Sequence, residues 1–68
     1  MAVPIDTEII RALRDSKKLT LEEAAKAAGM KSRQRWFNIE SGASTNPGIE
    51  TLEAMAQVLG VSVKKLLK

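Results

Sequence analysis

Hydrophobic residues recur along this chain at intervals of three and four, the spacing of side chains on one face of an α-helix. Five segments show this pattern, and we expect helices over residues 7–16, 21–28, 33–41, 49–59 and 63–67. No segment alternates apolar and polar residues as a half-buried strand does. The sequence therefore predicts a single all-α domain of five short helices over residues 1–68.

Residue types that favour helix ends stand at the borders of these segments. Asp6 precedes the first segment, and Thr20 with Glu23 has the spacing of a capping box at the start of the second. Gly29 follows the second segment and is suited to the positive φ that ends a helix, and Ser32 has the N-cap position of the third. Two short helices joined at Gly29 are typical of a helix-turn-helix, whose second helix is presented to the major groove of DNA.

The apolar positions predict which side of each helix is buried. At about 100° per residue, Trp36 and Ile39 lie within about 60° of each other and define the inner side of the third helix. The second helix is rich in alanine around Ala25, which favours close approach of a neighbouring helix. We expect Ala25, Gly29, Trp36 and Ile39 to form the core of the helix-turn-helix. The other core candidates are Ile9, Ile10, Leu13, Ile49, Leu52, Met55, Ala56, Leu59, Val63, Leu66 and Leu67.

The opposite side of the third helix carries amide, guanidinium and aromatic groups. Arginine pairs with guanine O6 and N7, and glutamine or asparagine pairs with adenine N6 and N7. Phe37 permits two interpretations, contact with thymine methyl groups or packing sideways against its own domain. Ordinary solvated surface is the alternative for the polar members. The base-reading candidates are Arg33, Gln34, Phe37 and Asn38.

The net charge is only +3, but it is unevenly distributed. Residues 11–35 carry eight basic and three acidic side chains, whereas residues 36–68 are neutral in balance and residues 1–10 carry a net charge of −2. A basic segment of this kind favours a polyanionic partner, although ordinary solvated helix charge gives the same count. The candidates for contacts with the DNA backbone are Lys18, Thr20, Lys31, Ser32, Arg35, Ser44, Thr45 and Asn46.

Composition argues against several other classes of function. The chain has no cysteine and no histidine, so we expect no disulfide, no metal site and no cofactor. There is no glycine-rich phosphate loop or paired-carboxylate pattern, and we do not expect an enzyme. No apolar run approaches the roughly 20 residues of a membrane span, and Pro4 and Asp6 interrupt any signal-peptide core. The expected location is the cytoplasm.

An ordered set of short motifs covers most of residues 9–67. The chain resembles the lambda repressor-like helix-turn-helix family of phage repressors, Cro proteins and XRE-type bacterial regulators. The resemblance implies a prokaryotic or phage-encoded regulator of transcription whose recognition helix is residues 33–41, bound to double-stranded DNA as a homodimer on a two-fold-symmetric operator. The motifs are Ile10-Arg11-Ala12-Leu13-Arg14, Leu19-Thr20-x-Glu22-Glu23, Ala25-x-x-x-Gly29, Ile39-Glu40-Ser41-Gly42, Pro47-x-Ile49-Glu50-Thr51-Leu52 and Leu59-Gly60-Val61-Ser62.

The chain departs from the family's pattern at three places. Met30-Lys31 precedes Ser32 where the family commonly has one residue, and the loop over residues 42–47 is also one residue longer. Leu21 stands where a phosphate-binding glutamine is frequent. The longer turn is expected to tilt the recognition helix and so to alter individual base contacts.

A second class of function fits the same fold. An antitoxin-like or adaptor domain would use it to hold a protein partner, with Phe37 and Leu67 as contact points. Weak, salt-insensitive binding to DNA would favour this alternative, because contacts with phosphates release counterions and depend steeply on salt.

Overall fold

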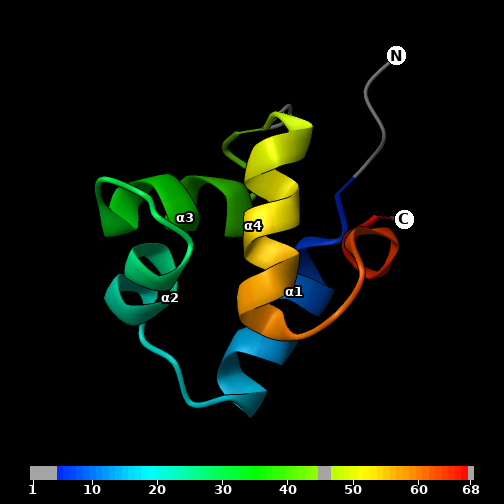
Figure 1. Ribbon diagram of the computed structural model, residues 1–68, viewed down its shortest axis with the longest axis horizontal. Helices are drawn as coiled ribbons and strands as arrows, with labels where there is room; N and C mark the ends of the chain where they lie inside the picture. The colour runs from blue at the N-terminus through cyan, green and yellow to red at the C-terminus, as the bar shows by residue number, and fades with distance from the viewer. Residues whose placement is uncertain (1–4, 45–46, 68) are drawn as a thin grey trace.

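The computed structural model describes residues 5–44 and 47–67, which form four α-helices and one 3-10 turn. In Figure 1, α4 runs through the middle of the molecule, with α2 and α3 on one side and α1 and η1 on the other. The described part of the chain contains no strand beyond an isolated antiparallel bridge between Ile5 and Leu67. The predicted all-α class is therefore confirmed. The elements are α1 (Thr7–Ser16), α2 (Leu21–Ala27), α3 (Arg33–Glu40), α4 (Ile49–Leu59) and η1 (Val63–Leu66).

The prediction of a fifth α-helix over residues 63–67 is wrong. The segment is a four-residue 3-10 helix, and Leu67 has already left the helical conformation, with φ −109° and ψ 145°. This extended conformation lets Leu67 bridge to Ile5, while the Asp6 N–H donates to the Leu66 carbonyl at 2.8 Å. Pairing with the start of the chain thus ends the helix before an α-helical turn is complete.

The other helices end within one residue of the predicted positions. α2 ends at Ala27 rather than at the predicted residue 28. Gly29, two residues after the end of the helix, has a φ of 76°. The Gly29 N–H donates to Lys26 at 3.0 Å and the Met30 N–H donates to Ala25 at 2.9 Å, the two bonds of a Schellman motif. The predicted role of Gly29 in ending the helix is confirmed.

Two of the predicted helix caps form, and one does not. The Asp6 side chain accepts from the Ile9 N–H at 3.2 Å, and Thr20 and Glu23 make both bonds of the capping box at 3.0 Å. The hydrogen bond from the Thr20 backbone lowers the pKa of Glu23 below its ordinary value. Ser32 does lie at the N-cap position of α3, but its side chain makes no capping hydrogen bond. Its backbone carbonyl instead accepts from the Arg35 N–H at 3.2 Å.

The core is formed by all five elements, with α2 packed most closely against α3. Trp36 and Ile39 are fully buried and Ala25 is 1% exposed, as predicted, whereas Gly29, the fourth expected core residue of the motif, is exposed because it lies in the turn after α2. Ile49, the first residue of α4, is 57% exposed, so its predicted place in the core is wrong. No helix within the described residues has the length and apolar character needed to cross a membrane. The buried hydrophobic residues are Ile10, Ala24, Ala25, Trp36, Ile39, Leu52, Met55, Ala56, Leu59 and Leu66.

Candidate nucleic-acid interface

α3 has a buried inner side and an open outer side. Trp36 and Ile39 are fully buried on the inner side, which confirms the predicted orientation of the helix. Arg33, Gln34 and Phe37 are exposed on the outer side, and Asn38 beside them is half-buried. The structure therefore brings the four base-reading candidates together on one accessible surface, which we call the outer side of α3.

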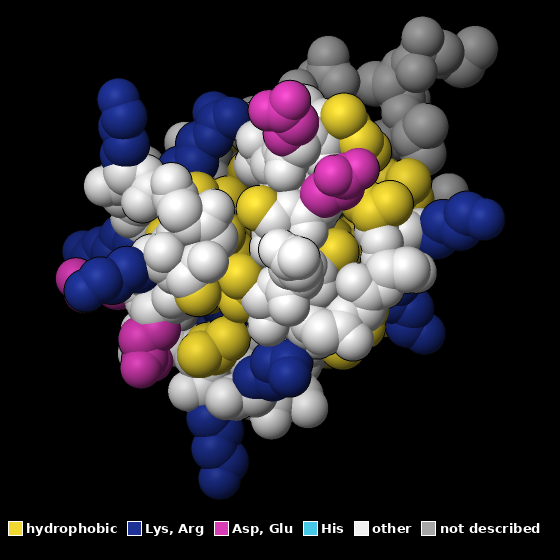
Figure 2. Space-filling model, viewed as in Figure 1, with side chains coloured by type: hydrophobic (Ala, Val, Ile, Leu, Met, Phe, Trp, Pro, Cys, Tyr) yellow, Lys and Arg dark blue, Asp and Glu magenta, His cyan; other side chains and the backbone are white. Residues whose placement is uncertain are grey.

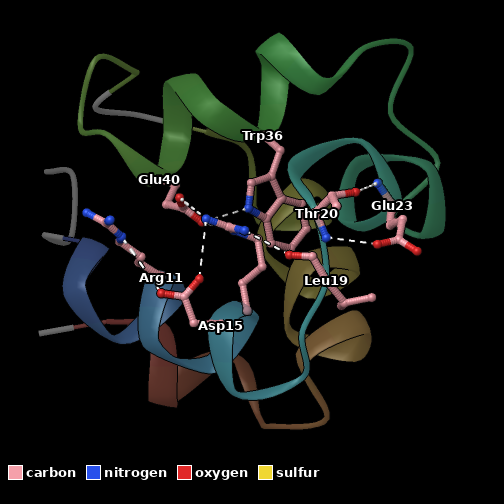
Figure 3. A network of polar contacts seen from close by, with 8 residues as sticks. Arg11, Asp15, Leu19, Thr20, Glu23, Trp36 and Glu40 are labelled. Carbon is pink, nitrogen blue, oxygen red and sulfur yellow. Dashed lines mark hydrogen bonds and ion pairs between the residues drawn. The ribbon is translucent and has the colours of Figure 1, made fainter.

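An ion pair between Arg14 of α1 and Glu40 of α3 holds the inner side in place (Figure 3). Arg14 Nε donates to Glu40 Oε1 at 2.7 Å and Arg14 Nη2 donates to Glu40 Oε2 at 3.0 Å, which makes the pair bidentate. Trp36 Nε1 also donates to Glu40 Oε1, at 3.1 Å. Arg14 Nη1 donates to the Leu19 carbonyl at 2.8 Å, so one guanidinium connects α1, α3 and the link before α2.

This pair is almost removed from solvent, with side-chain exposures of 13% for Arg14 and 6% for Glu40. The hydrogen bond to Glu40 raises the pKa of Arg14 above its ordinary value, against the opposing effect of burial. Paired and fully hydrogen-bonded charges are tolerated in such a place, whereas a single one is costly. This pair was not predicted from the sequence. The four-residue spacing of Trp36 and Glu40 was a signal that the carboxylate lies on the inner side.

Two polar side chains on the outer side of α3, those of Gln34 and Asn38, are bonded to each other. Gln34 Nε2 donates to Asn38 Oδ1 at 2.8 Å. Phe37 is 44% exposed, and it and Ile49 are the large hydrophobic side chains left open in the described part of the chain. The outer side thus offers amide donors and acceptors next to an apolar ring.

The candidates for backbone contacts are distributed over two regions. Lys31 and Ser32 line one surface hollow beside α2, at the start of α3, together with Arg33 of the base-reading candidates. Lys18 and Thr20 belong to the link between α1 and α2, which lies at the lower edge of Figure 1, away from α3. Thr20 also accepts the Glu23 N–H through its hydroxyl.

The remaining backbone candidates follow or flank α3. Arg35 is exposed, whereas Ser44 is half-buried and donates its N–H to the Asn38 carbonyl at 2.9 Å. Thr45 and Asn46 lie outside the described residues. Figure 2 shows Lys and Arg side chains projecting at several points of the rim, including the upper left over α3, and acidic side chains over the upper part of α4. Basic groups therefore border α3 but do not form one continuous patch in this view.

Comparison with known proteins places the chain among helix-turn-helix proteins. A family described as helix-turn-helix matches residues 10–66. The chain belongs to this family. It is the Cro, CI and XRE type expected from the sequence motifs, and its members are DNA-binding transcriptional regulators rather than a known class of enzymes. No curated protein matches the chain.

Two solved structures resemble this helix-turn-helix protein. One is a complex of the SinR and SinI proteins, at 37% identity with a TM-score of 0.81 over 88% of this chain. This chain spans only 57% of the matched chain there. The other is SinR, the master regulator for biofilm formation, in complex with DNA, at 38% identity with a TM-score of 0.82. That match covers 90% of this chain and 98% of the other.

Proposed function

We propose that this protein is a sequence-specific regulator of transcription that reads the major groove of double-stranded DNA with α3. The observation that carries the proposal is the outer side of α3, where Arg33, Gln34, Phe37 and Asn38 lie on a helix whose inner side is packed against the core. A DNA complex of SinR, 38% identical to this chain, supports the same class of ligand. Arginine, glutamine and asparagine supply the donors and acceptors that distinguish base pairs in the major groove.

Contacts with phosphates would hold α3 in register without reading sequence. Among the candidates for phosphate contacts, Lys31 and Arg35 are the charged residues closest in sequence to the start of α3, and both are exposed. Lys18 and Thr20, before α2, would reach a neighbouring phosphate on the other side of the motif. The half-buried Ser44, together with Ser32, Thr45 and Asn46, completes the proposed set.

We further propose that the protein binds as a homodimer on a two-fold-symmetric operator. One helix of eight residues contacts few base pairs, and dimeric helix-turn-helix proteins extend the site by placing two such helices about 34 Å apart. The same geometry requires the two half-sites to lie on one face of the duplex.

Selection from a randomised pool of DNA duplexes tests this function. The purified protein is challenged at about 150 mM salt, where weak contacts with phosphates alone no longer retain DNA. We expect a recovered motif with two-fold symmetry and half-sites about one helical turn apart. An asymmetric motif would argue against the dimer, and an unenriched pool would contradict sequence-specific reading.

Repeating the selection with variants of two glutamines tests whether α3 is the element that reads the DNA sequence. Gln34→Ala should change the base preferred at one position of each half-site. Gln57→Ala is the matched control, because Gln57 is exposed on α4, away from the outer side of α3. Equal loss of affinity on every sequence would instead show that Gln34 touches only the DNA backbone.

A protein-binding function remains the second candidate, favoured by one specific observation. Phe37 exposes 44% of its surface, and an apolar ring in this position suits a protein partner as well as a thymine methyl group. SinR itself is seen with the SinI protein. Leu67, the other suggested contact point, is half-buried and bridged to Ile5. Binding to DNA that is weak and unaffected by salt would favour this candidate.

A further inference from the structure

Asn38 lies one helical turn after Gln34 on the outer side of α3, and their side-chain amides are bonded at 2.8 Å. Side chains four residues apart are neighbours on a helix, so the contact needs no distortion of the backbone. The backbone around Asn38 is itself anchored, because its carbonyl accepts from the Ser44 N–H at 2.9 Å and from the Ser41 hydroxyl at 3.3 Å. The backbone of Asn38 is therefore held in place, and its side-chain amide is bonded to Gln34.

The hydrogen bond determines what Gln34 offers to a ligand. Its amide nitrogen carries two hydrogens, of which Asn38 takes one, and its Oε1 remains an open acceptor. With Asn38 taking the hydrogen trans to Oε1, the remaining N–H and Oε1 form an adjacent donor and acceptor. Adenine presents the complementary pair in the major groove, with N7 as acceptor and N6 as donor. Guanine presents two acceptors there, which would set its O6 against the Gln34 oxygen.

We propose that Asn38 is a positioning residue that orients the Gln34 amide for bidentate recognition of adenine. The inference rests on the proposed function, since it requires α3 to enter the major groove. Reversing the Gln34 amide alone would place its oxygen against Asn38 Oδ1, so the bond couples the orientation of the Gln34 amide to that of Asn38. A side chain that is oriented before binding also loses less conformational freedom on binding.

Replacing single adenines of the selected operator by 7-deazaadenine tests the inference, because this base keeps its pairing but lacks the N7 acceptor. Wild-type protein should bind about tenfold more weakly when the critical adenine of a half-site is replaced. Gln34→Ala should bind both duplexes equally. In Asn38→Ala the penalty should fall to about threefold, because Gln34 is present but no longer held.

Two further variants separate positioning from a general effect on the fold or on charge. Asn38→Asp keeps an acceptor for Gln34, so it should restore the tenfold ratio between the two duplexes even though its charge weakens binding to both. In Asn38→Ala combined with Gln34→Ala, the ratio should equal that of Gln34→Ala alone. Thermal unfolding of Asn38→Ala should match that of the Gln57→Ala control.

The outcomes distinguish this inference from the proposed function. A full tenfold penalty in Asn38→Ala would overturn the positioning role while leaving sequence-specific binding intact. Failure of Asn38→Asp to restore the ratio would overturn it as well, since the acceptor would then be irrelevant. If no operator can be selected at all, the proposed function itself is wrong, and the inference is overturned with it.

Discussion

The inner and outer sides of α3 differ in where their side chains find partners. On the inner side, Trp36 and Glu40 are bonded to each other, and Glu40 is bonded to α1 through Arg14. On the outer side, the side chains of Gln34 and Asn38 are bonded to each other, and Phe37 is open. Tertiary contacts therefore fix the inner side, while the outer side stays available to a ligand. Substitutions on the two sides should accordingly change different measurements.

Removing the indole of the inner side should have the largest effect. We expect Trp36→Ala to lower the free energy of unfolding by about 3–5 kcal/mol, because a fully buried aromatic side chain leaves a cavity. A chain of this size has little stability to spare, so the variant should be largely unfolded. Chemical denaturation followed by circular dichroism measures the change. If the variant unfolds at the same denaturant concentration as wild type, the assignment of the two sides of α3 is wrong.

Breaking the ion pair from one end should have the next largest effect. Arg14→Ala leaves Glu40 buried without its bidentate partner and should cost about 3 kcal/mol of unfolding free energy. The double variant Arg14→Met with Glu40→Leu should lose less unfolding free energy than the sum of the losses in Arg14→Met alone and Glu40→Leu alone. A double-mutant cycle measured by denaturation tests this. Simple additivity would show that the two side chains act independently.

The ion pair also shows what the sequence did not reveal. Arg14 and Glu40 are 26 residues apart, and their contact depends on how α1 packs against α3. The orientation of α3 was predictable because it follows from the local spacing of Trp36 and Ile39. Helix ends were predictable to within one residue because residues such as Thr20 and Gly29 act on their immediate neighbours.

Two errors in the predicted fold have the same origin. Ile49 fits the periodic apolar face of its helix, yet the structure leaves it 57% exposed at the first position of α4. Residues 63–67 have helical spacing, but Leu67 pairs with Ile5 from the other end of the chain. The spacing of apolar residues predicts which side of a helix faces the core. Whether each residue on that side is buried depends on elements that are distant in the sequence. The roles of the individual residues on the outer side remain predictions.

Phe37 provides a test on the outer side, with a smaller effect that should appear only in binding. If its ring contacts a thymine methyl group, replacing that thymine by uracil should weaken binding about fourfold, the effect of one buried methyl group. Phe37→Ala should abolish this difference and change the free energy of unfolding by less than about 0.5 kcal/mol. Titrations with matched thymine and uracil duplexes measure it. A loss of stability above about 1 kcal/mol would instead favour packing of Phe37 against its own domain.

Lys18 is a residue at which stability and binding should respond in opposite directions. It has a φ of 57°, a conformation that costs a non-glycine residue roughly 1 kcal/mol. The turn that ends α1 requires this positive φ. In it the Lys18 N–H donates to the Asp15 carbonyl at 2.9 Å and the Leu19 N–H donates to the Arg14 carbonyl at 3.2 Å. We expect Lys18→Gly to raise the free energy of unfolding by about 0.5–1 kcal/mol.

The same substitution removes a proposed phosphate contact. Affinity should therefore fall by a similar factor for all DNA sequences, and the slope of log affinity against log salt should decrease in magnitude by about one unit. Lys18→Ala is the matched control, since it removes the charge without relieving the backbone, and it should lose affinity without gaining stability. Unchanged affinity in both variants would remove Lys18 from the interface. The proposed basic contacts would then be confined to Lys31 and Arg35 at the start of α3, next to its outer side.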